Sequence, residues 1–85
     1  MNFHVELSSK AFRALSRLDV SDKKRAFDKI ESLENTPYPA GYKKLSGEND
    51  IYRLRFGNFR ILYKVSKTEH TILIFHIEKR SQVYK

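Results

Sequence analysis

Residues 51–63 read IYRLRFGNFRILY, two short runs of alternating polar and apolar residues on either side of Gly57-Asn58. A tight turn of this kind between two alternating runs predicts a β-hairpin. Successive side chains of a strand point to opposite faces of the sheet. The apolar residues of the first strand therefore share one face, which we expect to be the core: Tyr52, Leu54 and Phe56.

Arginines alternate with that apolar set. Arg53 and Arg55 share the opposite face, about 7 Å apart by the rise of a strand. Arg60 falls on the polar face of the second strand, where it can lie beside Arg55. Like charges at such distances repel, so we expect an anionic partner. The alternative is that cross-strand carboxylates neutralise the arginines, and Glu6 and Glu78 are the main candidates for that role.

Outward from the hairpin, hydrophobic periodicity predicts a strand over 2–7, helices over about 8–18 and 22–35, a loop over 36–50, and strands over about 51–56, 59–66 and 71–78. The stripes that we expect to face the core are Phe12, Leu15 and Leu18 in the first helix and Ala26, Phe27, Ile30 and Leu33 in the second. The order βααβββ predicts an α+β fold, an antiparallel sheet with two N-terminal helices packed on one face.

Length and composition limit the chain to one small domain. Its 85 residues are near the lower end of chains that fold alone, so we expect a single domain over 1–85. The sequence has no cysteine, which excludes disulfides and cysteine metal ligands. The longest apolar run, 72–75, is too short to cross a membrane, and no signal-peptide pattern is present. We therefore expect a cytoplasmic protein with no membrane partner.

The positive charge of the chain is unevenly distributed. The net charge is +7, and residues 43–85 hold ten of the 17 Lys/Arg but only four of the ten Asp/Glu. A basic excess in the half that contains the arginine hairpin favours a polyanionic partner such as nucleic acid, an anionic lipid or an acidic protein segment. The alternative is a solvated surface that only keeps the protein in solution.

Further basic and aromatic residues lie before the hairpin and after the last strand. Lys43 and Lys44 precede the hairpin, and Lys79, Arg80 and Tyr84 are close to the C-terminus. Arginine offers a planar fork for phosphate oxygens, and a tyrosine ring can stack on an unpaired base. With the hairpin arginines, these residues are the parts of a site for single-stranded RNA.

The histidines give a weaker signal. By strand alternation, His76 shares the face of Ile72 and Ile74, where a lone histidine is more often a packed residue than a catalyst. His4 and His70 are expected on a strand surface and in a turn. No histidine–carboxylate pair is evident, so the chain resembles a weak acid–base catalyst, and nothing indicates a metal, a cofactor or a small-molecule ligand.

Three blocks carry a family resemblance that covers essentially the whole chain: KLSG at 44–47, YRLRFGNFRILY at 52–63 and KRSQVY at 79–84. In this order and spacing they resemble the RelE/ParE superfamily of toxins, and the RelE branch in particular. The resemblance implies a type II toxin–antitoxin toxin that is a metal-independent, ribosome-dependent endoribonuclease. It implies cleavage of mRNA in the A site by attack of the 2′-hydroxyl on the adjacent phosphate. The implied partners are that mRNA, 16S-type rRNA and a cognate antitoxin.

The resemblance also implies roles for individual residues. The two basic residues of the family's hairpin strand match Arg53 and Arg55, which would hold the substrate and assist proton transfer. Arg60 and Arg80 match the arginines that would stabilise the charge of the transition state. Tyr84 matches the tyrosine that stacks on the mRNA base and orients it. Some relatives have lysine at the first two positions, and arginine cannot readily give up its proton, so the identity of the general base is left open.

Two other functions are compatible with this sequence. One is a ParE-like toxin that inhibits DNA gyrase, since both branches share a fold, although the gyrase branch generally lacks the full arginine and tyrosine set. The other is an inactive basic module kept for binding the antitoxin or nucleic acid. Cleavage of mRNA, inhibition of supercoiling and absence of growth arrest on expression would distinguish the three.

Overall fold

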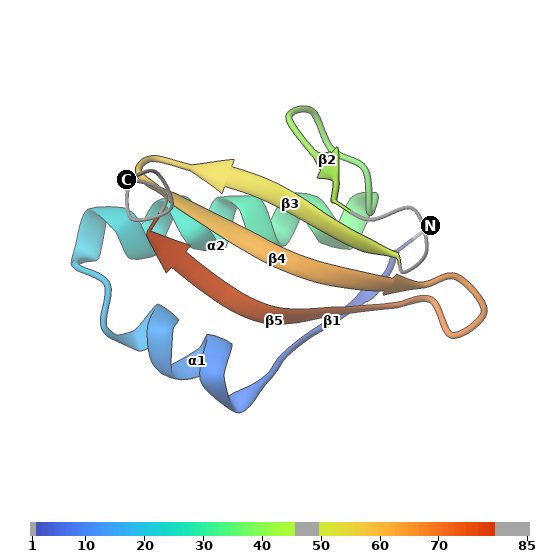
Figure 1. The fold of residues 1–85 in the computed structure, drawn as a ribbon, viewed down its shortest axis with the longest axis horizontal. Helices are drawn as coiled ribbons and strands as arrows, with labels where there is room; N and C mark the ends of the chain where they lie inside the picture. Colours follow the sequence, from blue (N-terminus) through green and yellow to red (C-terminus); the bar gives the residue numbers. More distant parts are fainter. Residues whose placement is uncertain (1, 46–49, 80–85) are drawn as a thin grey trace.

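The computed structural model describes residues 2–45 and 50–79, whose arrangement is shown in Figure 1. Its elements in chain order are β1 (His4–Leu7), α1 (Ser9–Ser16), α2 (Val20–Asn35), β2 (Lys43–Lys44), β3 (Ile51–Phe56), β4 (Phe59–Ser66) and β5 (Thr71–Lys79). The α+β class and the predicted helices and strands are confirmed. The prediction of a loop over 36–50 is wrong at one point, because Lys43 and Lys44 form the short strand β2.

The strands form one sheet in the order β1-β5-β4-β3-β2. β3, β4 and β5 are an antiparallel meander, as predicted, and β2 extends it by pairing antiparallel with β3. β1 lies at the opposite edge and runs parallel to β5, so the sheet is mixed rather than wholly antiparallel. Alternation in the sequence gives the faces of a strand but not the direction of its neighbour, which explains the difference.

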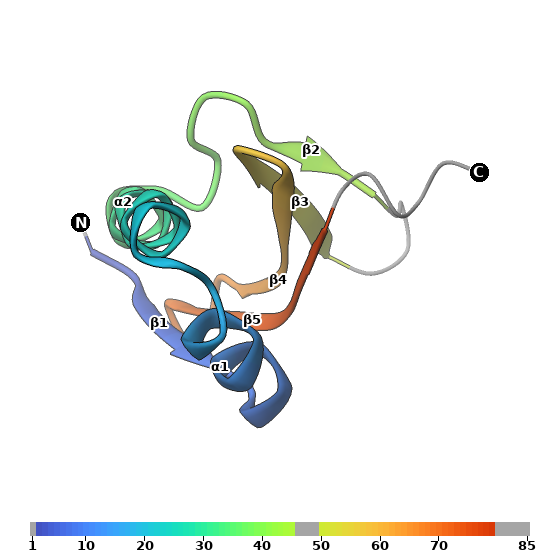
Figure 2. The ribbon, with the colours of Figure 1, turned by 90° about the vertical axis from the view of Figure 1, so that its left-hand side faces the viewer.

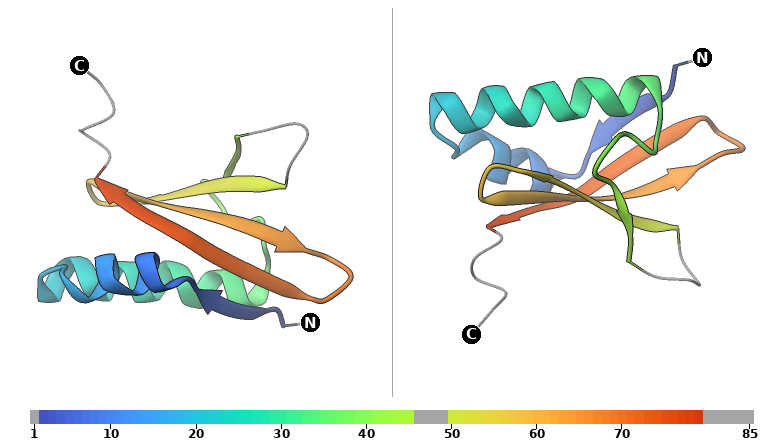
Figure 3. Two further views of the ribbon diagram at one scale, coloured as in Figure 1. Left: turned by 60° about the horizontal axis from the view of Figure 1, so that its bottom comes forward. Right: turned by 90° about the horizontal axis from the view of Figure 1, so that it is seen from above.

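Both helices cover the same face of the sheet, as Figures 2 and 3 show. α1 packs against β5, and α2 packs against β3 and β1. The largest side chains that are completely buried between the helices and the sheet are Tyr63, Leu33, Leu54, Ile61, Ile72 and Ile74. Most of the apolar positions predicted for this core are confirmed. Neither of the two described helices lies on the opposite face of the sheet, which we call the open face.

Two aromatic residues expected in the core are exposed instead. α1 turns Ala11 and Leu15 toward the sheet, so Phe12, one position further along, points away and is 61% exposed. α2 buries Ala26, and Phe27 beside it is 53% exposed. The predicted stripes were wrong at these positions because each residue of a helix is rotated by about 100° from the one before, and small alanines occupy the closest approach to the sheet.

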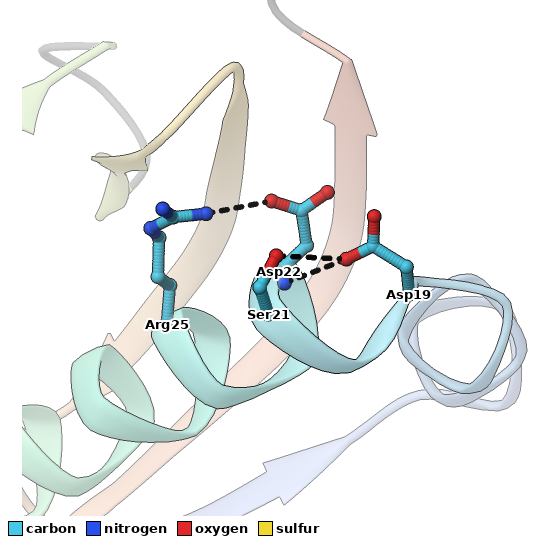
Figure 4. Close-up of polar contacts among 4 residues, drawn as sticks. All are labelled: Asp19, Ser21, Asp22 and Arg25. Atoms are coloured by element: carbon cyan, nitrogen blue, oxygen red, sulfur yellow. Dashed lines mark hydrogen bonds and ion pairs between the residues drawn. The ribbon is translucent and has the colours of Figure 1, made fainter.

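The first turn of α2 supports the hairpin between β3 and β4. Asp19 caps the helix by accepting from the N–H of Asp22 at 2.8 Å and from the Ser21 hydroxyl at 3.2 Å (Figure 4). The Asp22 N–H lowers the pKa of Asp19. Asp22 also accepts from Arg25 at 3.1 Å. A Cβ placed on Gly57, whose φ is +54°, would meet both Asp22 and Arg25 at 3.8 Å. The turn therefore rests against this ion pair.

The loop after α2 is fixed by a buried tyrosine. The Tyr63 hydroxyl donates to the carbonyl of Pro37 at 2.7 Å, and its ring stacks on Tyr52 with 5.6 Å between centroids. Burial raises the pKa of Tyr63, and burial with a hydrogen bond to Tyr38 raises the pKa of Tyr52 to about 12. Both phenols are therefore neutral, and their contacts hold the start of the 36–50 segment against the sheet.

A β-bulge interrupts the pairing of β4 with β5. Leu62 pairs with His76, but the next residue, Tyr63, pairs with Ile74, so Phe75 is the extra residue. The Phe75 carbonyl accepts from the hydroxyl of Ser8 at 3.2 Å, and Ser8 is also the N-cap of α1. The start of the first helix is thereby tied to the irregular point of the sheet.

The bulge changes which side chains of β5 face the core. Before it, Ile72 and Ile74 are buried, and after it the buried residue is Ile77. One inserted residue shifts the alternation by one position and moves every later side chain to the other face. The prediction that His76 shares the face of Ile72 and Ile74 is therefore wrong. His76 and Glu78 lie on the open face.

Candidate functional site

The strand register places charged residues of three strands in one row across the open face. Arg55 lies directly opposite Arg60, and Arg60 lies directly opposite Glu78. Cross-strand neighbours of this kind have Cβ atoms about 4.5–5.5 Å apart. The expectation that Arg60 sits beside Arg55 is confirmed. Two arginines therefore occupy neighbouring positions on one face of a rigid sheet, with the carboxylate of Glu78 at the end of the row.

A second row runs beside the first and supplies more positive charge. Lys43 on β2 lies opposite Arg53, and Arg53 lies opposite Leu62, which in turn lies opposite His76. Arg53 is half-buried, whereas Arg55 and Lys43 are exposed. The pattern brings three of the predicted arginines and one predicted lysine onto the same surface.

Glu78 is bound by two donors on this surface. One carboxylate oxygen, Oε2, is paired with Nε of Arg60, and the other, Oε1, accepts from Nε2 of His76 at 3.0 Å. The three side chains are only 14%, 26% and 22% exposed for Arg60, His76 and Glu78, respectively. The ion pair uses Nε of Arg60 and leaves its terminal Nη groups outside the pair. Those groups carry the N–H donors that suit a phosphate.

Glu6 and Glu78, the carboxylates expected to neutralise Arg53 and Arg55, have other partners in the structure. Glu78 pairs with Arg60 instead, and Glu6 pairs with His4 at 3.1 Å near the β1 edge of the sheet. Within the described part of the chain, Arg55 forms no ion pair. The charge of Arg55 is therefore available to an anion that comes from outside.

His76 has a defined hydrogen position. Its Nδ1 atom is buried and meets no hydrogen-bond partner among residues 2–45 and 50–79. Its Nε2 atom faces Glu78, which as a carboxylate can only accept, so Nε2 carries the hydrogen. Sequence reasoning missed this histidine–carboxylate pair, because it assigned His76 to the core face. The signal was present nonetheless, since His76 and Glu78 are two residues apart and share a face of any strand.

The remaining predicted residues lie on the helix-covered face or beyond the described ranges. Lys44 pairs with Tyr52 on the helix-covered face, and its Nζ lies 5.9 Å from the centre of that ring and 4.0 Å from Asp50. Lys79 pairs with Phe59, whose ring packs against the core. The Lys79 side chain is therefore also on the helix-covered face. The other two predicted site residues, Arg80 and Tyr84, lie outside the described residues.

Neither a metal site nor a membrane-spanning helix is present in the described ranges. Among residues 2–45 and 50–79, no group of three or more His, Asp and Glu side chains is placed to hold a metal ion. Neither helix in that part is long and apolar enough to cross a bilayer. The cluster of Arg55, Arg60, His76 and Glu78, with Arg53 and Lys43 beside it, is the candidate site.

Comparisons with known proteins agree with this fold. A family model described as the ParE toxin of type II toxin–antitoxin systems, parDE, matches residues 5–84. A Methanocaldococcus jannaschii protein assigned as toxin RelE1 is 34% identical over 88 residues, covering 100% of this chain and 98% of the relative. Toxin RelE of Mycobacterium tuberculosis is 26% identical over 84 residues, covering 98% and 87%.

Solved structures extend the similarity to three dimensions. A chain of the archaeal RelE–RelB complex from Pyrococcus horikoshii has a TM-score of 0.86 and 28% identity, covering 96% of this chain and 99% of that one. The isolated E. coli RelE toxin has a TM-score of 0.81 at 20% identity, covering 96% and 90%, which shows the shared fold alone. The two helices on a five-stranded mixed sheet are common to this chain and these structures.

Proposed function

The chain belongs to the ParE toxin family of type II toxin–antitoxin systems and is a toxin of its RelE branch, and from this premise we propose that it is a ribosome-dependent endoribonuclease that cleaves mRNA in the A site. The observation that carries the proposal is the cross-strand pair of Arg55 and Arg60 on the open face. Two guanidinium groups that the sheet holds together favour an anion that binds both of them, such as a phosphodiester.

The proposed reaction is an internal transfer within the RNA. The 2′-oxygen of one nucleotide attacks the adjacent phosphorus, and the 5′-oxygen of the next nucleotide leaves. The pentavalent transition state carries more negative charge on its non-bridging oxygens than the ground state, so preorganised cations stabilise it selectively. Arg55 and the Nη groups of Arg60 are the described residues suited to that task, and Arg53 and Lys43 would hold the neighbouring phosphates.

Arg80 and Tyr84 complete the proposal from the sequence. Arg80 would add a further positive charge at the phosphate, and Tyr84 would stack on the base and align the 2′-hydroxyl for attack. Both residues follow β5, which ends beside the arginine row at Lys79. Their roles rest on the family motif that they match.

Toeprinting on ribosomes programmed with a defined mRNA tests the proposed activity. The wild-type protein is expected to cut within the A-site codon, and Arg60→Ala and Arg80→Ala are each expected to slow cutting at least about 100-fold, as loss of a preorganised charge donor does. Arg13→Ala is the matched control, because Arg13 is an exposed arginine on α1, on the helix-covered side. Absence of A-site cutting by the wild-type protein would refute the proposal.

We infer that the chain is held by a cognate antitoxin. The Pyrococcus horikoshii structure is a RelE–RelB complex, and toxin–antitoxin complexes of Mycobacterium tuberculosis RelBE2 and of E. coli RelBE share this fold. In this chain, three apolar side chains on the helices are unusually exposed: Phe12, Val20 and Phe27 at 61%, 86% and 53%. An amphipathic antitoxin segment with acidic residues would cover such apolar surface and mask the basic open face.

A second candidate function is inhibition of DNA gyrase. It is favoured by the matching family model, which is described by the name ParE. A supercoiling assay with purified gyrase distinguishes the two activities. Inhibition of supercoiling by the wild-type protein, with mRNA left intact on translating ribosomes, would support this function and exclude the mRNA endonuclease.

A further inference from the structure

One carboxylate lies within the arginine row, where a surface built only to bind phosphate would avoid negative charge. Glu78 is directly opposite Arg60, and both of its oxygens are engaged, one by Arg60 and one by His76. The open face offers a direct comparison. Glu6 forms the same kind of pair with His4, also two residues away, but those side chains are 57% and 69% exposed and lie on β1. The Glu78 group is the sheltered one of the two.

We propose that Glu78 is the general base that takes the proton from the attacking 2′-hydroxyl, with His76 as the residue that positions it. This inference rests on the proposed endoribonuclease activity and names the group that the family motif leaves open in this chain. Attack by a hydroxyl requires a nearby proton acceptor, and the arginines cannot serve because they do not lose their protons at working pH.

The other described groups of the cluster are excluded by geometry. His76 donates its Nε2 hydrogen to Glu78, and its Nδ1 is buried, so neither nitrogen is presented to a substrate. Glu78 accepts hydrogen bonds at both oxygens, and its ionised carboxylate is the form that can also accept a proton. Each carboxylate oxygen has a further lone pair, so a hydroxyl can bind without displacing Arg60 or His76.

The distance from phosphate to base is set by Arg60 itself. Its planar guanidinium holds Glu78 at Nε, while the Nη groups are left for the scissile phosphate. The phosphate and the carboxylate are then separated by the width of one guanidinium. The attacking 2′-hydroxyl belongs to the nucleotide that carries this phosphate. A phosphate bound at the Nη groups therefore brings that hydroxyl within hydrogen-bond reach of Glu78.

The step balances with water as the only co-reactant. The 2′-hydroxyl proton moves to the Glu78 carboxylate as the bond from the 2′-oxygen to phosphorus forms. The bond from phosphorus to the 5′-oxygen breaks, and that oxygen takes a proton from water. The products are a 2′,3′-cyclic phosphate and a 5′-hydroxyl, and the hydroxide that remains recovers the proton from Glu78.

Single-turnover cleavage on programmed ribosomes, measured from about pH 4, the ordinary range of a glutamate carboxyl, to about pH 9 with saturating toxin, tests the assignment. Glu78→Gln keeps the size of the side chain and an oxygen that can accept from Arg60, but it cannot take the proton. Its cleavage rate is expected to fall at least about 100-fold, and the acid limb of the wild-type pH profile should disappear. The described charged groups that face Glu78 are Arg60 on β4 and His76 on β5, with Arg55 beyond Arg60 on β3.

Three further measurements separate catalysis from structure. Glu78→Asp, which keeps the carboxylate, is expected to recover part of the rate and the acid limb. Glu6→Gln removes the exposed counterpart on the same face and is expected to cleave at the wild-type rate. With a substrate whose leaving 5′-oxygen is replaced by sulfur, the Glu78→Gln defect should persist, because a better leaving group does not remove the need for a base.

The outcomes distinguish this assignment from the proposed function. Wild-type cleavage that Arg60→Ala abolishes but Glu78→Gln leaves intact would overturn the assignment alone. Rescue of Glu78→Gln by the sulfur substrate would also overturn it, because Glu78 would then protonate the leaving group. If Glu78→Gln does not fold, cleavage by Glu78→Asp at the full wild-type rate would reject the role. No cleavage by the wild-type protein would reject both proposals.

Discussion

At the scale of single residues, Arg60 has two roles: it stabilises the sheet through its ion pair with Glu78, and it offers its Nη groups to a phosphate. Its side chain is 14% exposed and is paired with Glu78, which is 22% exposed. Charges sheltered from water are costly to leave without a partner, so each member of this pair should depend on the other. The same guanidinium must also keep its Nη groups available for a phosphate, which ties the stability of the strand pair to the proposed chemistry.

A double-mutant cycle on Arg60→Ala and Glu78→Ala measures this dependence. We expect a coupling energy of about 1–2 kcal/mol in urea unfolding, typical of a sheltered hydrogen bond between charged groups. The control is the pair of Lys24 and Asp28, with a separation of 3.9 Å and exposed fractions of 78% and 63%. That exposed pair should give less than about 0.5 kcal/mol. Equal coupling energies in the two cycles would contradict the sheltered character of the Arg60 pair.

In regular strands, the sequence predicted correctly on which face the site residues lie. The alternation of 51–56 placed Arg53 and Arg55 on the open face, and the two-residue turn placed Arg60 opposite Arg55. The same reasoning failed for His76, because the bulge at Phe75 leaves no mark in the hydrophobic pattern. A bulge is set by how two strands meet, and a single strand's sequence does not contain that information.

At the scale of whole elements, the helices and the meander were predictable, and the edges of the sheet were not. Hydrophobic periodicity and capping residues locate α1 and α2, and the hairpin turn locates β3 and β4. The strand β2 has two residues, which are too few to show the alternation of polar and apolar residues that predicts a strand. The parallel pairing of β1 depends on the path of the helices across the sheet. Exposure of Phe12 and Phe27 similarly follows from how each helix is rotated on the sheet.

The cap of α2 makes a prediction about pH at this scale. The N–H of Asp22 lowers the pKa of Asp19, so the charged cap stabilises the folded state above the ordinary titration range of aspartate and loses this effect as the pH falls through the folded pKa. Asp19→Ala should therefore lower the melting temperature at pH 6, and the difference from the wild type should shrink toward pH 2.5. Circular dichroism at 222 nm follows the transition.

Asp28→Ala is the control for that measurement. Asp28 is also an exposed aspartate on α2, but it lies within the helix, and among the described residues its ion pair is with Lys24 at 3.9 Å. We expect a small change in melting temperature at pH 6, as for most exposed ion pairs. A difference between wild type and Asp19→Ala that stays constant from pH 6 to pH 2.5 would show that the charge of the cap does not contribute.

At the scale of the whole molecule, the sheet separates two surfaces of different chemistry. The open face carries the arginine rows, and the other side carries the helices with their exposed apolar residues. The adjacent lysines of β2 report on this separation, because Lys43 lies opposite Arg53 on the open face whereas Lys44 lies over the ring of Tyr52. Their sequence positions alone predicted the same role for both.

The salt dependence of RNA binding should distinguish these two lysines. Each phosphate contact adds about 0.7 to the slope of log Kd against log salt for a single strand. Lys43→Ala should reduce the slope by about that amount, and Lys44→Ala should leave it unchanged. Fluorescence anisotropy with a labelled single-stranded RNA between 50 and 300 mM KCl is the measurement, with those concentrations chosen as roughly the range where counterion release dominates. A smaller slope for Lys44→Ala alone would place the RNA on the helix-covered side.

The antitoxin should bind the apolar surface of the helices, which the RNA leaves free, in addition to the basic open face. Phe12 and Phe27 are more than half exposed, and exposed aromatic rings are the residues that most often anchor protein partners. Replacing both with serine removes apolar area that is already in contact with water, so the free toxin should keep its melting temperature. Affinity for the cognate antitoxin, measured by calorimetry, should fall at least about tenfold. Arg13→Ala, on the same helix as Phe12, should bind normally. Unchanged affinity of the double variant would mean that the antitoxin neutralises the toxin through the open face alone, in direct competition with the message.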